Sequence, residues 1–555
     1  MAGGIRATTR LMLYHRNMTT QTFILELPIK ADDSQSRTIS KKFEYGRMLY
    51  NATLGSGLGR LTQMRQDPEW RCACEMSKGK ERNELFRRLN RQYRLTEYDF
   101  HSDIARHREG TKRKSELGIC EAQKLATQAF NAVSRYMFKQ GGRPRFKSFK
   151  RGLHSLEGKT NTTGLKFKPE KMLLDWCRKT YQVMLDPEDT YALEALYADK
   201  ERTKFKRIKY NRIVCRNIKG VKRFYLQVVL EGTPPVKHAY APASERMAID
   251  PGPKAFAVFC PRVQAKVQIA PQAKVNEKAI RRIQRSMDRS LRAKNPNAFD
   301  EKGRIKPGVS LAYSKGYQAR LTKLREAHRK VAGTRKCEHG ELANLLLECA
   351  GNIRIEKNSW EAFKRSHFGR SINNSAASGF IQKLKSKAER AGLTVEEVSP
   401  YRLKPSQYDP YKDEFVKKAL GERWMYLGDE STVIQRDIMS AILIYFADLK
   451  NQTHNPEVVK TNLEGLKRGL TDAGYVKHLK LPRSSGSKDP LFAPEPKALT
   501  TEELRSKCFR VDSDRHSSTI NGTDGKAVGW SETFPLTGEL FRDSVLSSVS
   551  ARGAS

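Results

Sequence analysis

The stretch MAIDPGPKAFAVF, residues 247–259, decides how the second half of the chain folds. An apolar run, residues 247–249, ends on the carboxylate of Asp250, and Pro-Gly-Pro separates it from a second apolar run. Burying an unpaired carboxylate is costly, so a strand that closes on aspartate needs either solvent or a cation beside it. Asp-Pro-Gly-Pro is also good turn chemistry. A surface turn and a metal-binding aspartate therefore both stay open until other carboxylates are placed.

Two further carboxylates stand at comparable positions. In NIRIEKNSW, residues 352–360, Glu356 closes an alternating strand, and in IQRDIMSAILI, residues 434–444, Asp437 opens an apolar helix. Strand ends and a helix start of this kind can meet at one edge of a mixed sheet, and carboxylate oxygens are ligands that suit Mg²⁺. Two such ions, about 4 Å apart, activate a water and stabilise a leaving oxygen. Asp250, Glu356 and Asp437 are therefore predicted to be catalytic and metal-binding.

The charge of the chain points to a polyanionic partner. Its 555 residues carry 104 Lys and Arg against 61 Asp and Glu, a net charge of +43. Such an excess repels itself in the folded state, and nucleic acid is the expected partner, with an anionic membrane surface as the alternative. No apolar run is long enough to span a membrane, and the N-terminus lacks the apolar core of a secretion signal. A cytoplasmic, nucleoid-associated protein is expected, with reduced cysteines.

Patterning divides the chain into segments. Residues 21–30 alternate as a strand, and residues 40–139 have helical spacing with strongly basic outer faces. GGRPRFKSFKR, residues 141–151, breaks this helical part, and the short strands that follow it suggest a small barrel. An α/β unit begins near residue 247. After Lys450 the chain is rich in Ser, Pro and Gly and is expected to be loosely ordered, apart from a helix near residues 456–470.

Taken in order, these motifs resemble a known family. AIDPGPKAFAVF, NIRIEKNSW and IQRDIMSAILI are similar to the split RuvC nuclease of transposon-encoded TnpB proteins and type V CRISPR effectors. GGRPRFKSFKR resembles the family's GxPRFK lead-in to its wedge barrel, and INNSAASGFIQKLKSKAERAGLTVEEVSP resembles the stretch between its second and third nuclease motifs. Each motif is weak alone, but the ordered set is specific. The resemblance covers residues 20–450 and puts Asp250, Glu356 and Asp437 at the three catalytic positions.

The fold that this resemblance implies is an α+β multidomain chain. It has a helical recognition lobe, a small β-barrel wedge domain and an RNase H-like (RuvC) α/β nuclease domain with a small insert. The expected domains are residues 1–39, the first part of the wedge barrel; 40–140, the helical recognition domain; 141–240, the wedge barrel; 241–398, the first nuclease part with its basic helices; 399–432, an insert that binds target nucleic acid; 433–450, the second nuclease part; and 451–555, the C-terminal tail.

The function implied is that of an RNA-guided DNA endonuclease, a hydrolase that uses Mg²⁺ or Mn²⁺. Its partners would be a guide RNA, from a CRISPR array or a transposon end, and a target DNA carrying a short flanking motif, with a monomer or homodimer on one guide. An RNA-guided DNA-binding protein with weak or no cleavage is the first alternative, because Pro251 and Pro253 stiffen the turn after Asp250. An RNase H-like resolvase or transposase is the second. The candidate phosphate contacts are Arg143, Arg145, Lys147, Arg281, Arg282 and Arg285.

The sequence departs from the family in the insert. Most members carry a four-cysteine zinc ribbon between the second and third motifs, whereas residues 399–437 contain no cysteine. Too few ligands remain for a structural zinc site, so no zinc is expected. The insert is instead expected to be a small fold whose core is formed by Tyr408, Trp424 and Tyr426.

Overall fold

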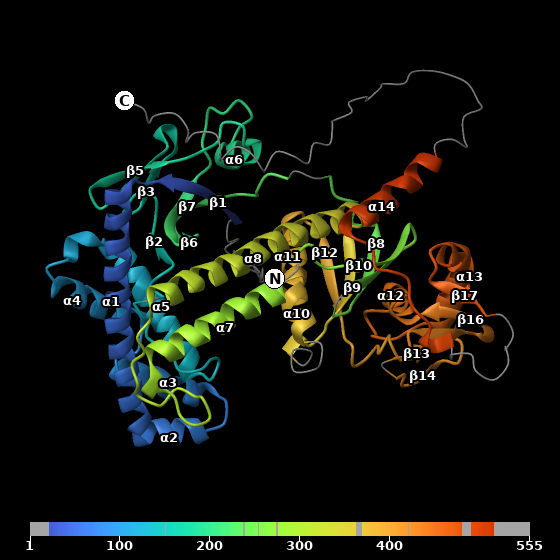
Figure 1. Cartoon of the computed structure of the whole chain (residues 1–555), viewed down its shortest axis with the longest axis horizontal. Helices are drawn as coiled ribbons and strands as arrows, with labels where there is room; N and C mark the ends of the chain where they lie inside the picture. The colour runs from blue at the N-terminus through green and yellow to red at the C-terminus, as the bar shows by residue number, and fades with distance from the viewer. Residues whose placement is uncertain are drawn as a thin grey trace, which may run out of the picture. The chain divides into compact units, whose positions relative to one another are not determined.

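The computed structural model describes residues 21–149, 151–236, 239–253, 255–273, 276–361, 369–419, 421–479 and 490–515. The chain divides into two compact units, Met1–Leu504 and Arg505–Ser555. The second unit is described only as far as the end of α14 (Thr501–Arg515). Mixed helices and sheets make up the first unit (Figure 1). No helix in the described part of the chain is long and apolar enough to cross a bilayer.

A curled antiparallel sheet forms a half-barrel around the first strand. Its seven strands have the order β2-β6-β7-β1-β5-β4-β3, and within the described residues β2 and β3 are its edges. The small β-barrel predicted from the sequence is therefore found as a half-barrel with two free edges among the described residues. β1 pairs with β7 along most of its length, which joins the start of the chain to strands that follow the helices. The strands are β1 Thr22–Lys30, β2 Ser155–Glu157, β3 Lys166–Lys168, β4 Leu173–Trp176, β5 Lys179–Val183, β6 Ile208–Ile218 and β7 Val221–Glu231.

The helical part begins earlier than the predicted boundary at residue 40. The Asp32 side chain accepts a hydrogen bond from the Gln35 amide at 2.7 Å, and the Gln35 side chain bonds back to Asp32. This reciprocal capping box satisfies amides that a helix start leaves free, and it begins α1 at Asp33. The helices here are α1 Asp33–Gln66, α2 Pro68–Glu75, α3 Lys80–Gln92, α4 Glu97–Glu109 and α5 Ile119–Met137; α6 Thr190–Leu196 follows β5.

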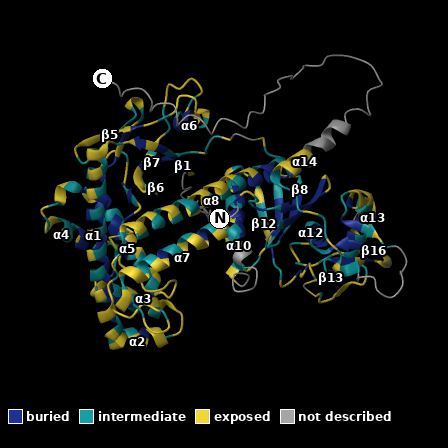
Figure 2. Cartoon of the chain, viewed as in Figure 1, coloured by how far each residue is buried: buried dark blue, intermediate teal, exposed yellow. Residues whose placement is uncertain are grey.

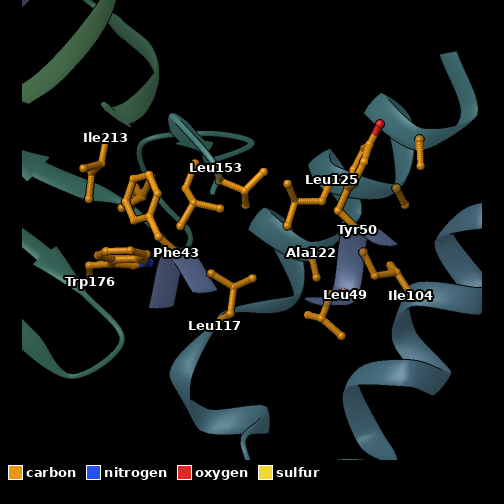
Figure 3. Close-up of a cluster of buried hydrophobic side chains, with 14 of the residues drawn as sticks. Phe43, Leu49, Tyr50, Ile104, Leu117, Ala122, Leu125, Leu153, Trp176 and Ile213 are labelled. Atoms are coloured by element: carbon orange, nitrogen blue, oxygen red, sulfur yellow. The ribbon is translucent and has the colours of Figure 1, made fainter. Parts of the chain in front are cut away.

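One apolar core joins these helices to the half-barrel (Figure 3). Side chains from helices and strands that are distant in sequence meet in it, including Phe43 of α1, Leu125 of α5 and Trp176 of β4. Trp176 is fully buried, with 0% of its surface exposed. The segments predicted as separate helical and barrel domains thus share a core, and burial of their apolar surface stabilises both together.

Glu121 of α5 is a carboxyl group inside this region, with 0% of its surface exposed. Burial raises its pKa, because it disfavours the charged form, and the nearby Lys42 ammonium only partly offsets the effect. The folded state therefore holds a proton that the unfolded state releases, and stability falls as pH rises above the ordinary carboxyl range.

The Glu121→Gln variant is expected to be more stable than the wild type at pH 8 and about equal to it near pH 4.5. Between the usual and the raised pKa, its advantage grows by up to about 1.4 kcal/mol per pH unit, the linkage slope for one proton. Chemical unfolding at both pH values measures this, with Glu81→Gln, at an exposed position of α3, as control. A stability gap that does not widen with pH contradicts the prediction.

A second, five-stranded sheet carries the stretch that opened the sequence analysis. Its order is β10-β9-β8-β11-β12. β8, β9 and β10 form an antiparallel meander, whereas β8, β11 and β12 are parallel. Parallel strands end at the same edge of a sheet, so the residues that close β8 and β11 are brought to one edge. The strands are β8 Arg246–Pro251, β9 Ala255–Cys260, β10 Val263–Gln268, β11 Asn352–Glu356 and β12 Thr394–Val398.

The helices around this sheet differ in burial (Figure 2). α12 (Arg436–Phe446) packs against β8 and β9, and every residue from Ile438 to Ile444 is buried. By contrast, α7 (Glu277–Lys294) buries only Ile280 and Met287 among its residues. The basic surface of α7 is left to solvent. The remaining helices of this region are α8 Lys315–Cys349, α10 Gly369–Ser375 and α11 Ala377–Arg390.

The tail after Lys450 is more ordered than predicted. The helix expected there is confirmed as α13 (Pro456–Asp472), and it buries Val459, Leu463 and Leu470. β17 (Val476–His478) joins β15 (Trp424–Leu427) and β16 (Asp429–Gln435) in a three-stranded sheet. The prediction of a loosely ordered tail is wrong for β17 and for residues 493–499, because β17 pairs with β16 and the Ala493, Ala498 and Leu499 backbones are hydrogen-bonded to Trp424, Gln268 and Lys266.

The insert depends on this tail for its core. Tyr408, in β13 (Tyr408–Asp409, paired with β14, Glu414–Phe415), and Trp424 are buried as predicted, but Tyr426 is 38% exposed, so its placement in the core is wrong. The Trp424 indole N–H donates to the Ala493 carbonyl at 2.9 Å, and the Lys477 ammonium lies 4.0 Å from the ring centroid. Both partners of Trp424 come from residues beyond 450, so the core of the insert also includes residues of the tail.

Candidate active site

Asp250 and Glu356 lie side by side at the sheet edge. Ile249 of β8 and Ile355 of β11 are register partners in parallel strands, and each carboxylate follows its isoleucine directly. Adjacent strands are about 4.8 Å apart, and equivalent positions point to the same face. The Asn358 side-chain amide donates to the Pro251 carbonyl at 3.0 Å and so ties together the two loops that follow these strands. The turn after Asp250 is thus braced from outside as well as by its prolines.

Asp437 comes to this site from the first turn of α12. The Gln435 side chain caps the helix by accepting from the Ile438 amide at 2.8 Å. Asp437 Oδ2 accepts from the Lys266 ammonium at 2.7 Å and from the Gln435 amide at 3.2 Å. Both donors also bond to Glu495 Oε2, Lys266 at 2.7 Å and Gln435 at 2.9 Å. Arg436 forms a longer ion pair with Asp437 Oδ1 at 3.7 Å. Asp437 therefore belongs to a five-residue polar network beside the Asp250–Glu356 pair.

The three predicted carboxylates differ in their electrostatics. Burial raises the pKa of Asp250 well above its usual range, and the negative charges of Glu356 and Asp437 raise it further. Burial also raises the pKa of Glu356 to about 7, although a hydrogen bond from Asn358 acts in the opposite direction. For Asp437, burial is outweighed by attraction to Lys266, and the pKa is lowered. The charge state of Asp250 therefore depends on the charges of Glu356 and Asp437.

Asp250 and Glu356 fit a divalent cation. Their oxygens are the donors that Mg²⁺ prefers. Burial raises the pKa of both groups, because it disfavours their charged forms, and a bound cation would favour those forms again. Across the described ranges, however, no three His, Cys, Asp or Glu side chains converge as a ready metal-binding group. Asp437, in contrast to the pair, already has a cationic partner in Lys266.

Sequence reasoning missed Lys266, Gln435 and Glu495. Lys266 lies in the middle of the buried strand β10. A lysine in the apolar run VQAKVQIA indicates that a buried anion lies near it. Glu495 had no such signal, because APEP, residues 493–496, reads as a loop in a Pro-rich tail. Its contact with Lys266 spans 229 residues of sequence.

The lead-in segment to the half-barrel is fixed to α1. The Lys147 amide donates to the Asn51 side chain at 2.9 Å, and the Lys147 carbonyl accepts from Arg47 at 2.8 Å. The Lys147 ammonium lies 4.9 Å from the centroid of the Tyr50 ring. Arg143 and Arg145 are exposed. The structure thus holds the backbone of this segment in place and leaves two of its three predicted phosphate contacts to solvent.

The predicted contacts on α7 are exposed as well. Arg281 pairs with Glu277 at 3.2 Å, whereas Arg282 and Arg285 have no carboxylate partner within the described residues. The six predicted cations therefore fall into three kinds: four unpaired and exposed, one ion-paired on its own helix, and one placed over an aromatic ring. The unpaired ones are the better candidates for phosphate contacts, because they lose no internal partner when they bind.

No protein-family model and no curated protein matches the chain. Among solved structures, the chain is similar to one in a cryo-EM structure of the Cas12f1–sgRNA–target DNA complex, with 12% identity, a TM-score of 0.37 and coverage of 76% of this chain and 98% of that one. It is also similar to a chain in a cryo-EM structure of a CRISPR–Cas12f ternary complex, with 13% identity, a TM-score of 0.19 and coverage of 68% and 77%. Because both TM-scores are low, we base the proposed function on the residues of the site.

Proposed function

We propose that the protein is an RNA-guided DNA endonuclease whose phosphodiester hydrolysis takes place at Asp250, Glu356 and Asp437. The observation that carries the proposal is the placement of Asp250 and Glu356 at the ends of two adjacent parallel strands, with Asp437 delivered by the helix that packs on the same sheet. The strand order β10-β9-β8-β11-β12 places the two parallel strands that end on these acids next to each other, which supports this assignment.

In the proposed reaction, Asp250 and Glu356 would hold Mg²⁺ or Mn²⁺ through their carboxylate oxygens, with Asp437 as the third ligand. Such an ion, when bound, activates a water and stabilises the leaving oxygen. The chain itself supplies placement: β8 and β11 fix the spacing of the pair, Asn358 braces their loops, and Gln435 caps the helix that presents Asp437. The net charge of +43 suits a chain that binds both a guide RNA and a target DNA.

A guided DNA-binding protein with weak cleavage is the second candidate, and one observation favours it. Lys266 is hydrogen-bonded to Asp437, so a metal ion must compete with an internal ammonium for this ligand. Sequencing of RNA that copurifies with the protein tests the guided part of both candidates. Recovery of a defined RNA, followed by Mg²⁺-dependent cleavage of a matched DNA that EDTA stops, supports the endonuclease. Binding without cleavage supports the second candidate, and absence of any defined RNA contradicts both.

The purified protein is expected to contain no stoichiometric zinc. Residues 399–437 correspond to the zinc ribbon of the family that the chain resembles, but they contain no cysteine. Tyr408 and Trp424 are buried in the core of this segment instead. Elemental analysis after gel filtration measures the metal content. About one zinc per chain contradicts the prediction, and the nine cysteines would then need to be tested as ligands.

A further inference from the structure

Lys266 is a buried cation that two carboxylates share. Its side chain is 8% exposed, against 25% for Asp437 and 33% for Glu495, and its ammonium lies 2.7 Å from an oxygen of each. Its backbone is fixed on both sides, because the amide donates to the Tyr475 hydroxyl at 2.8 Å and the carbonyl accepts from the Leu499 amide at 2.7 Å. The ammonium is therefore held between the two acids by a rigid strand.

Glu495 is held just as firmly. On one side of it, the Ala493 carbonyl accepts from the Trp424 indole at 2.9 Å, and on the other, the Ala498 carbonyl accepts from the Gln268 side chain at 2.7 Å. Leu499 then forms a parallel bridge with Val267 of β10. These bonds anchor the segment at both ends, so the contact of Glu495 with Lys266 is built into the fold.

Because Asp437 and Glu495 share one ammonium, both Lys266 and Glu495 affect how tightly a divalent cation binds at Asp437. A divalent cation at Asp437 is repelled by the Lys266 ammonium and attracted by the carboxylates around it. Glu495 attracts the same ammonium and adds negative charge, so it offsets the effect of Lys266 on Asp437. The Gln435 amide, which bonds to both acids, keeps them in place without adding charge.

We propose that Lys266 and Glu495 are positioning residues that act in opposite directions on the affinity of Asp437 for a divalent cation. Lys266 lowers this affinity by neutralising Asp437, and Glu495 restores it by sharing the ammonium. The proposal rests on the proposed function, because it takes the carboxylates at the sheet edge as the cation site. It assigns the tail segment around Glu495 a role in tuning that site.

Substitutions of Lys266 and of Glu495 are expected to change the affinity for Mn²⁺ in opposite directions. Lys266→Met keeps the length of the side chain and removes its charge, so binding of Mn²⁺ is expected to tighten by about tenfold. Glu495→Gln keeps a hydrogen-bond acceptor and removes the shared charge, so binding is expected to weaken by about tenfold; both figures correspond to about 1.4 kcal/mol. The double variant restores the original net charge and is expected to return towards the wild-type affinity.

The experiment is a titration of the full-length protein with MnCl₂, followed by electron paramagnetic resonance of free Mn²⁺. Lys412→Met and Glu414→Gln, both at exposed positions, control for general charge effects, and thermal melts establish that each variant is folded. Lys266→Arg keeps the charge and is expected not to tighten binding. If Lys266→Met does not fold, the Mn²⁺ affinities of Glu495→Gln and Lys266→Arg still test the proposal. Weaker binding by Glu495→Gln, without tighter binding by Lys266→Arg, is then the expected result.

The outcomes separate this inference from the proposed function. If Asp250→Ala leaves Mn²⁺ binding unchanged, the cation site lies elsewhere and the proposed function fails. If Asp250→Ala abolishes binding, but Lys266→Met and Glu495→Gln both weaken it or both leave it unchanged, the site stands and the opposing roles are overturned. Opposite signs in the two single variants, with an affinity of the double variant between theirs, support the inference.

Discussion

Alanine at Asp250, Glu356 or Asp437 is expected to lower DNA cleavage by orders of magnitude while guided DNA binding stays near that of the wild type. Each substitution removes metal ligands from the chemical step. None of the three side chains belongs to the exposed basic surfaces on α7 or the lead-in segment. Single-turnover cleavage of a matched DNA and a binding assay with the same DNA measure the two effects. Asp472→Ala, at an exposed position of α13, is the control.

Replacement of each acid by its amide provides a further test of the site, because the three acids have different electrostatic surroundings. The pKa of Asp250 is raised by burial and like charge, and that of Glu356 is raised to about 7 by burial. Each group therefore destabilises the fold as pH rises through the carboxyl range, and the loss is complete above the folded pKa. In EDTA at pH 8, Asp250→Asn and Glu356→Gln are expected to be more stable than the wild type, although they do not cleave.

Asp437→Asn is expected to behave in the opposite way. Attraction to Lys266 outweighs burial and lowers the pKa of Asp437, so its charge stabilises the fold above the ordinary carboxyl range and this contribution is lost as pH falls. Its replacement leaves a buried ammonium with Glu495 as its remaining carboxylate partner. Unfolding curves of the three variants at pH 8 check the signs. A triple variant that cuts DNA at the wild-type rate contradicts the assignment of the site. A change of stability in the same direction in all three single variants contradicts the electrostatic description of the site.

Local patterns in the sequence predicted the elements that carry the carboxylates. The apolar run over residues 247–249, the alternation over residues 352–356 and the apolar helix after Asp437 each reflect burial of one face or of a whole element, and burial leaves such a signature in the sequence. The closing acids were conspicuous because a strand that ends on a carboxylate needs a reason. These features depend on a few neighbouring residues, so one sequence is enough to find them.

The missed features depend on contacts between distant segments. Glu495 is linked to Asp437 through Lys266 and Gln435, and the segment that carries Glu495 is fixed by Leu499 on β10. Nothing in the Pro-rich run around Glu495 indicates that it adds to a sheet edge. Tyr426 was misplaced for a related reason, because the partners that cover Trp424 on the same strand, Ala493 and Lys477, come from the tail. The half-barrel likewise shows that short strands predict a sheet better than they predict its closure.

Binding of a matched DNA is expected to need the copurified RNA and to weaken steeply with salt. Contacts of Lys and Arg with phosphates release counterions, so affinity should fall by about 10³-fold or more between about 50 and 200 mM salt if six or more phosphates are neutralised. Such contacts carry little base information, so the choice of sequence should follow the guide. Titrations of labelled DNA at several salt concentrations, with and without the RNA, measure both properties.

Individual arginines should contribute unequally to that salt dependence. Arg143 and Arg282 are exposed and have no carboxylate partner in the part of the chain that the structure describes, so alanine at either is expected to flatten the slope of log Kd against log salt by about one unit. Arg281 pairs with Glu277, so the net change on its removal should be smaller. Each variant should weaken binding equally on all matched targets. Equal sequence-specific binding with and without RNA would instead rule out guided recognition and favour a resolvase-like protein that reads DNA directly.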